Sequence, residues 1–256
     1  LDSNTTAANN TAVGYDALTA ATTGGANSGI GHNAGKGITT ATGNTAVGAY
    51  TNQAACTGND NTSVGYYSLS ANTSGTRNAA LGTSCLGANT TGSDNVAIGH
   101  NTLDASTTSS NNVAIGKDAL TAQTTGSGNT AVGKDAFKAL TTASDGVAVG
   151  WAALDACTTG QNNSAVGYGA LGAVTTGLNN TALGHLALGS STASNCVAIG
   201  AYSNDASCTG NENISVGGGS LGQNTSGNSN VAIGASALAN NTTASKTTAV
   251  GYDSLL

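Results

Sequence analysis

A short phrase that ends in glycine returns along the whole chain at nearly constant spacing. An aliphatic residue precedes this anchor glycine in all fifteen copies, and successive anchors lie 17 residues apart except for one step of 16. The anchors are Gly14, Gly31, Gly48, Gly65, Gly82, Gly99, Gly116, Gly133, Gly150, Gly167, Gly184, Gly200, Gly217, Gly234 and Gly251. A strict period of this length is typical of solenoids, in which each repeat is one coil that packs only against its neighbours.

The length and content of the repeat exclude a helical solenoid. Two helices need about 33 residues per repeat, and Thr, Asn and Gly are poor residues for helix interiors. The generic repeat reads G-x-x-A-L-x-x-x-T-T-G-x-x-N-T-A-V. The sequence therefore predicts an all-β fold, a parallel β-solenoid or β-roll of about fifteen 17-residue coils, stacked about 4.8 Å apart. We expect one repeat domain over residues 1–256.

The frequent positions of the repeat are predicted to be structural. The invariant glycine indicates a positive φ or a contact too close for a Cβ atom. The aliphatic residue before each anchor and the Leu four after it are expected to form the rows of a thin core. Asn four before the anchor is expected to form a buried amide ladder, which would include Asn61 and Asn213. A lone coil buries too few aliphatic side chains to offset its ordering entropy, so coils must stack.

Charge and hydropathy restrict the partners. Six basic and twelve acidic residues give a net charge of −6, so the basic surface that nucleic acids require is not expected. No apolar run approaches the roughly 20 residues of a membrane span, which argues against direct membrane insertion. The phrase is already in register near Leu1 and still in register in the final "GYDSLL". Without atypical end coils, we expect end-to-end continuation or a homo-oligomer, as part of a longer fibre.

The position directly after the anchor varies most and holds most of the aromatic residues. It is the candidate for a subunit contact or a ligand contact, and simple solvent exposure is the alternative. The aromatic candidates are Tyr15, Tyr66, Trp151, Tyr168 and Tyr252. All three histidines occupy the same position, but they lie too many coils apart to share one metal ion, so no metal site is predicted.

No arrangement typical of catalysis was found. Asp118 and Asp135 sit beside Lys117 and Lys134, which suggests charge pairing across coils on a surface. Phosphate-binding loops, zinc-ligand spacings and nucleophile motifs are missing from the sequence. We therefore expect neither enzymatic activity nor a cofactor.

Five cysteines are candidates for disulfide bonds, with pairing that the sequence leaves open. They are Cys56, Cys85, Cys157, Cys196 and Cys208. An odd number leaves at least one unpaired or linked to another chain. Cys56 and Cys208 occupy two sister coils, "AYTNQAACTGNDNTSVG" and "AYSNDASCTGNENISVG", in which Asn52 and Asn204 replace the usual Leu. Cys196 lies in the shortened coil, where a local irregularity is expected.

Glycosylation is a further candidate modification, for a chain secreted by a glycosylating cell. Four N-x-S/T sites fall in the "NTT" or "NTS" turn and are expected to be exposed. They are Asn72, Asn89, Asn224 and Asn241.

The stretches "NTAVGYDALTAATTG" and "NVAIGKDALTAQTTGSGNTAVG" resemble the head repeats of trimeric autotransporter adhesins and related 17-residue repeats of phage and environmental fibres. The resemblance covers the whole chain. It implies a left-handed roll, parallel homotrimers and attachment at a cell surface. The chain differs in its longer coil and in the added "TTG" arc.

These observations favour a structural protein of an extracellular or virion fibre, filament or adhesin head. We expect the chain to associate with further copies of itself, as a homotrimer or a filament. Cell-surface or glycan targets are further candidate partners in this prediction. The expected location is extracellular, at a cell surface or at a virion surface. The alternative is a ligand-binding solenoid that recognises glycans or ice. Ice-binding solenoids favour T-x-T on a flat strand, whereas two adjacent threonines here precede glycine and indicate a turn.

Overall fold

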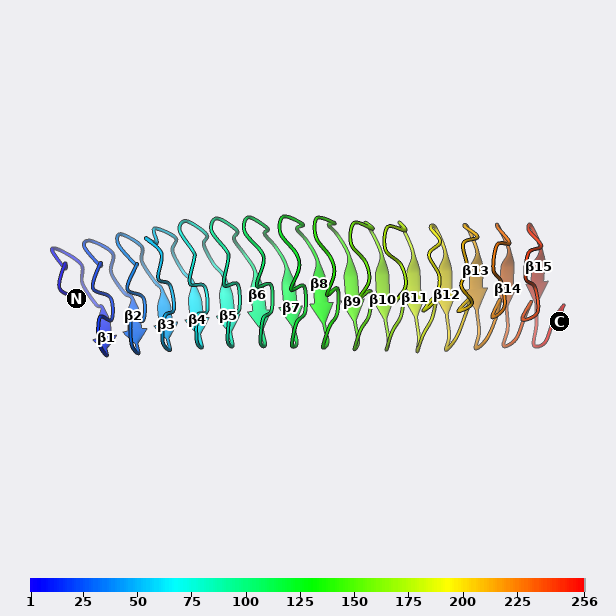
Figure 1. Ribbon diagram of the computed structural model, residues 1–256, viewed down its shortest axis with the longest axis horizontal. Helices are drawn as coiled ribbons and strands as arrows, with labels where there is room; N and C mark the ends of the chain where they lie inside the picture. Colours follow the sequence, from blue (N-terminus) through cyan, green and yellow to red (C-terminus); the bar gives the residue numbers. More distant parts are fainter. Residues whose placement is uncertain (256) are drawn as a thin grey trace. The chain divides into compact units, whose positions relative to one another are not determined.

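The computed structural model describes residues 1–255, and within them the chain is all-β. Fifteen three-residue strands, one per coil, stand immediately before the anchor glycines. Neighbouring strands are parallel and in register, so that Val96 lies opposite Val113 and Ala97 opposite Ala114. The predicted parallel β-solenoid of 17-residue coils is confirmed (Figure 1).

The chain divides into two compact units, Leu1–Asn129 and a second unit that begins at Thr130. In each unit the strands lie side by side in sequence order. Unit 1 contains β1 (Thr11–Val13), β2 (Ser28–Ile30), β3 (Thr45–Val47), β4 (Thr62–Val64), β5 (Ala79–Leu81), β6 (Val96–Ile98) and β7 (Val113–Ile115). Unit 2 contains β8 (Thr130–Val132), β9 (Val147–Val149), β10 (Ser164–Val166), β11 (Thr181–Leu183), β12 (Val197–Ile199), β13 (Ile214–Val216), β14 (Val231–Ile233) and β15 (Thr248–Val250). The expectation of a single repeat domain stays a prediction.

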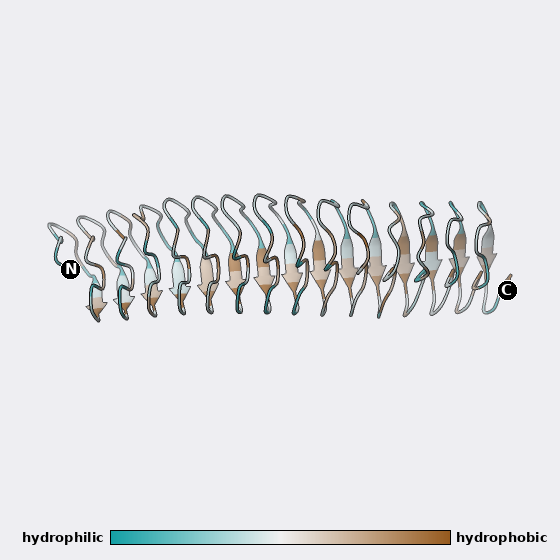
Figure 2. Ribbon diagram, viewed as in Figure 1, coloured by the Kyte–Doolittle hydropathy of each residue, from teal (hydrophilic) through white to brown (hydrophobic). Residues whose placement is uncertain are grey.

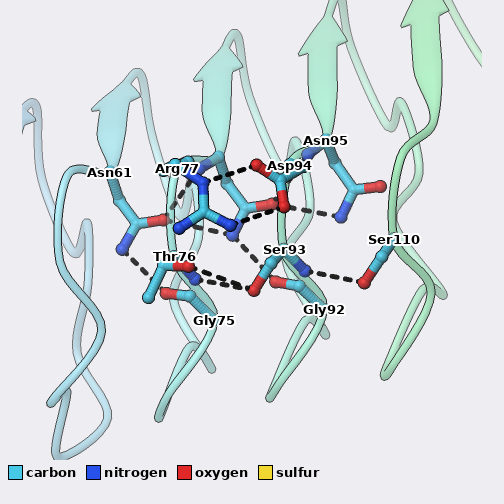
Figure 3. Close-up of polar contacts among 10 residues, drawn as sticks. Asn61, Gly75, Thr76, Arg77, Gly92, Ser93, Asp94, Asn95 and Ser110 are labelled. Carbon is cyan, nitrogen blue, oxygen red and sulfur yellow. Dashed lines mark hydrogen bonds and ion pairs between the residues drawn. The ribbon is translucent and has the colours of Figure 1, made fainter.

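Hydrogen bonds join successive coils at several points around the coil, outside the sheet as well as in it. The Thr73 amide, outside the strands, donates to the Thr90 carbonyl at 2.9 Å. The predicted asparagine ladder is confirmed: the side-chain amides of Asn78 and Asn95 each donate to the preceding ladder oxygen at 3.1 Å. Asn61 and Asn95 appear in this ladder in Figure 3, and Asn213 is buried in unit 2 as expected.

The core contains smaller side chains than the sequence suggested. The predicted core row formed by the aliphatic residues before the anchors is wrong. The middle residue is buried in β2 to β15 and partly buried in β1, whereas the aliphatic residue before the anchor is not buried. In β6, Ala97 is fully buried and Ile98 is 38% exposed. Side chains alternate across a strand, so a three-residue strand directs only its middle residue inward. The core consists instead of these small residues, the Leu row four after the anchor, and further rows three and seven after the anchor, such as Ala119 and Leu140.

The Leu row adopts a backbone conformation that leucine seldom takes. Leu69 and Leu120 have φ of 50° and 51°, in the left-handed region, which costs about 1 to 2 kcal/mol for a non-glycine residue. Burial of the side chain offsets this cost by about 2 kcal/mol. Of the residues that replace Leu in this row, Gly35, Asn52 and Asn204 belong to types that tolerate positive φ, whereas Phe137 has a φ of 51° and, like Leu, is fully buried.

Both predicted reasons for the anchor glycine are confirmed. All fifteen anchors have φ between 120° and 140°. A Cβ atom on Gly133 would also lie 2.4 Å from the carbonyl oxygen of Gly150, the anchor of the next coil. The anchors therefore stack at a distance that excludes any side chain.

The shortened coil keeps its place in the sheet. Thr181 of β11 still pairs with Val197 of β12, although only 16 residues separate them. The Cys196 amide donates to the Asn180 side-chain oxygen at 2.9 Å, as an asparagine at that position would. The missing residue is absorbed in the arc between Leu188 and Cys196, so the predicted irregularity does not reach the strands.

We expect Gly133→Ala to lower the free energy of unfolding by about 3 kcal/mol or more, because the new methyl group meets backbone atoms of the next coil and φ is unfavourable. Gly219→Ala is the matched control. Gly219 also has positive φ, at 64°, but nothing lies within 4 Å of its Cβ position, so a loss of only about 1 kcal/mol is expected. Urea unfolding of both variants measures the difference, and equal losses would contradict the stacking argument.

Asn204→Leu should stabilise the protein by about 2 kcal/mol. Asn204 is fully buried and both of its amide atoms lack hydrogen-bond partners, while Leu188 and Leu221 hold the same position in the adjacent coils. The control is Asn213→Leu, since the Asn213 amide donates to the carbonyls of Gly210 and Gly227. That control should destabilise, and urea unfolding in which both variants lose stability would refute the prediction.

Candidate interaction surfaces

An aliphatic stripe runs along the outer face of the sheet in each unit. It consists of the residues directly before the anchors. In unit 1 these are Val13, Ile30, Val47, Val64, Leu81, Ile98 and Ile115, and in unit 2 they are Val132, Val149, Val166, Leu183, Ile199, Val216, Ile233 and Val250. None of them is buried, and Leu183 is 48% exposed. Strands such as β6 and β9 are correspondingly brown in Figure 2.

The outer face of the sheet carries no charge on any strand within residues 1–255. Its second outward row, the first residue of each strand, contains Thr, Ser, Ala, Val or Ile. None of the strands has Thr at both outward positions, and paired threonines such as Thr90 and Thr91 lie in a bend, as expected. This face is therefore a regular array of mostly β-branched side chains, without the T-x-T strand of the ice-binding alternative.

The aromatic residues of unit 1 form a column of rings beside the stripe. Tyr15 stacks on His32 with ring centroids 5.4 Å apart and planes at 12°. His32 meets Tyr50 at 5.1 Å, and Tyr50 stacks on Tyr67 at 5.0 Å. Tyr66 lies nearly perpendicular to Tyr67, with centroids 4.5 Å apart. We name these five residues the unit 1 column.

Unit 2 contains a second column, formed by Trp151, Tyr168, His185 and Tyr202. Its ring centroids are separated by 5.3, 5.1 and 5.1 Å in that order. The Lys134 amino group lies over the Trp151 ring, 5.4 Å from its centroid. Four of the five predicted contact residues, Tyr15, Tyr66, Trp151 and Tyr168, thus join other rings.

Five column residues were not among the predicted contact residues: His32 and His185, which stand directly after the anchor, and three tyrosines from the next position of the repeat. Tyr50, Tyr67 and Tyr202 stand two after the anchor, yet their rings reach the same column. The fifth predicted contact residue, Tyr252, is 78% exposed and no ring contact was found for it within the described residues. A sequence signal could have revealed the columns. It is an aromatic residue one or two positions after the anchor glycine in several successive coils.

The charged groups near the columns are paired, but not all as predicted. Lys117 pairs with Asp118 and Lys134 with Asp135, so these pairs form within one coil and the cross-coil expectation is wrong. A hydrogen bond from Lys134 lowers the pKa of Asp135. Ion pairs across coils occur elsewhere, at Lys36 with Asp16 and in the bidentate pair drawn in Figure 3.

That bidentate pair joins Arg77 to Asp94. The two nitrogen-to-oxygen distances are 2.6 and 2.8 Å (Figure 3). The hydrogen bond from Arg77 holds the pKa of Asp94 below its usual value. Both side chains are exposed, so the pair contributes little to stability.

Three of the four glycosylation candidates are corrected by their burial. Asn72, Asn89 and Asn224 are fully buried, and each side-chain amide donates to a backbone carbonyl three residues later at 2.9 to 3.0 Å. They cannot accept a glycan in the folded chain, because the turn directs them inward. Asn241 is partly exposed, and its glycosylation stays a prediction.

All five cysteines are free and buried, so the structure contains none of the candidate disulfides. Cys56, Cys85, Cys157, Cys196 and Cys208 lie on the inner side of different coils. Burial raises the pKa of every one of these thiols, and that of Cys196 reaches about 11. They behave as small apolar core residues with weak donors.

The folded chain should therefore resist thiol reagents. With the thiolate disfavoured and access blocked, Ellman's reagent at pH 8 is expected to label fewer than about one thiol in the native protein and all five in guanidinium. Stability should fall as the pH rises from about 9 towards 11, since the unfolded thiols ionise before the native ones. Rapid native labelling would show that the coils open readily.

Among residues 1–255 no group of three or more His, Cys, Asp or Glu side chains is placed to hold a metal ion. That range also lacks a helix with the length and apolar character needed to cross a membrane. Comparison with protein-family models and with curated proteins found no match.

Proposed function

We propose that this chain is a structural protein that self-associates through its aliphatic stripe and builds an extracellular or virion-surface fibre or filament. The observation that carries the proposal is the stripe itself, a run of outward aliphatic residues repeated once per coil. The proposal includes no catalytic activity and no cofactor.

The energetics of the stripe support association. Covering a half-exposed Val, Ile or Leu contributes about 1 kcal/mol. In unit 2 the stripe includes five residues that are 37% to 67% exposed, namely Val166, Leu183, Ile199, Ile233 and Val250. Exposed apolar surface of this extent is typical of interaction sites. Because the strands carry no charge, no charged group of the sheet would have to be desolvated when two stripes meet.

The regularity of the stripe favours another copy as its partner. The parallel strands repeat at about 4.8 Å, so a second copy in parallel orientation presents side chains with the same spacing and can interleave with the first. Closed association of three copies, the arrangement that the adhesin-head resemblance implies, would cover the stripes; a filament is the open alternative.

The test compares two leucines of equal type and similar exposure. Leu183→Lys places a charge in the stripe, at a position 48% exposed, and Leu178→Lys places one outside it, at a position 42% exposed. Analytical ultracentrifugation should find the wild type and the Leu178 variant associated and the Leu183 variant shifted to monomer, because an ammonium group would be buried against apolar side chains. A monomeric wild type, or equal effects of both variants, would refute the proposal.

A further inference from the structure

The two aromatic columns share a motif that recurs in both units with nearly the same geometry. Tyr15 and His32 stack at 5.4 Å and 12°, and Tyr168 and His185 at 5.1 Å and 17°. Each histidine then meets the tyrosine of a sister coil, Tyr50 or Tyr202, 5.1 Å away at 68° or 60°. Two separate places in the chain thus build the same Tyr-His-Tyr arrangement, which is exposed except for the half-buried Tyr50.

Each column also contains a ring that is nearly perpendicular to its ring neighbours. The plane of Tyr66 is at 86° to Tyr50 and 89° to Tyr67, and the plane of Trp151 is at 77° to Tyr168. Within residues 1–255, neither Tyr66 nor Trp151 is stacked face to face on another ring, whereas Tyr15 and Tyr168 each stack on a histidine. Tyr66 is 49% exposed and Trp151 is 55% exposed.

The chemistry of the columns is apolar along the rings and polar at the tips. Phenol hydroxyls and imidazole nitrogens supply donors and acceptors at the edge of the rings. The nearby cations Lys36 and Lys134 are each paired with an aspartate. A partner that offers apolar ring faces, many hydroxyls and no net charge fits this combination.

We propose that each aromatic column is a binding site for a neutral polysaccharide. The rings of Tyr66 and Trp151 stack on the apolar face of a sugar ring, and the column tips donate and accept hydrogen bonds along the chain. Ring centroids repeat about every 5 Å along a column, which is about the width of one sugar ring, so a short run of sugars matches a column. The proposal is independent of the self-association proposed above.

A second copy of the chain is the less favoured occupant of the columns. The aliphatic stripe presents no polar atoms in its side chains and is suited to a dry contact between subunits. The columns present a hydroxyl or ring nitrogen at every coil, and burying these against protein would leave some of them unpaired. A hydroxyl-rich ligand pairs them instead.

The experiment is calorimetric titration of the full chain with two neutral hexasaccharides, cellohexaose and maltohexaose. We expect one of them to bind with two sites per chain. Trp151→Ala and Tyr66→Ala should each remove one site, or weaken it about tenfold, while Tyr252→Ala should keep both. Tyr252 is the matched control, because it is an exposed aromatic residue outside the columns.

A second readout uses the single tryptophan of the chain. Because Trp151 belongs to the unit 2 column, its fluorescence should shift to shorter wavelength when the sugar excludes water, and Tyr168→Ala should weaken that response. Circular dichroism melts of the variants check that they fold. Binding of neither hexasaccharide, equal loss with Tyr252→Ala, or an effect of Trp151→Ala on sedimentation alone would overturn the proposal.

Discussion

The close stacking of anchor glycines is the constraint on which the rest of the structure depends. Within each unit, an anchor such as Gly31 or Gly133 stands where a side chain would collide with the carbonyl of the next anchor, so the distance between coils is set at this point of the repeat. Every other position then meets its own counterpart one coil away. Strand pairing, the asparagine ladder and the ring columns are consequences of that alignment, and a favourable contact made once is made again along the unit.

The same geometry requires an unusual backbone. Besides the anchor, positive φ recurs at three positions of the repeat, represented by Asp94, Asp118 and Leu120. Aspartate, asparagine and glycine tolerate this conformation, and they are frequent at the first two positions. Leucine does not favour it, and is retained at the third because the coil has few other places for a large apolar side chain. Where Asn52 or Asn204 takes that place, the residue type tolerates the same positive φ better, but the core loses a large apolar side chain.

The sequence predicted the architecture well and the surfaces only in part. The 17-residue period, the glycine conformation and the buried amides of Asn61 and Asn213 follow from repetition alone. The orientation of Val and Ile could not be read from hydrophobicity, because a three-residue strand gives no periodicity with which to tell its inner from its outer face. The columns were only half predicted, since Tyr50 and Tyr66 come from different positions of the repeat and meet only in space. The buried Asn72 illustrates the opposite error, in which a polar turn sequence was expected to be exposed.

The shortened coil has a consequence for how such a protein can change in evolution. One residue is missing before β12, yet the strand register is intact. The segments that connect the strands can therefore lose a residue without a change in strand pairing. Loss or gain of a whole coil would be milder still, because the coils on either side of the junction would present the same faces to each other. A gene built of such units can be lengthened or shortened by unequal recombination, and the product then changes length in steps of about 5 Å. The number of coils in such a solenoid can therefore change in evolution with little effect on how each coil folds.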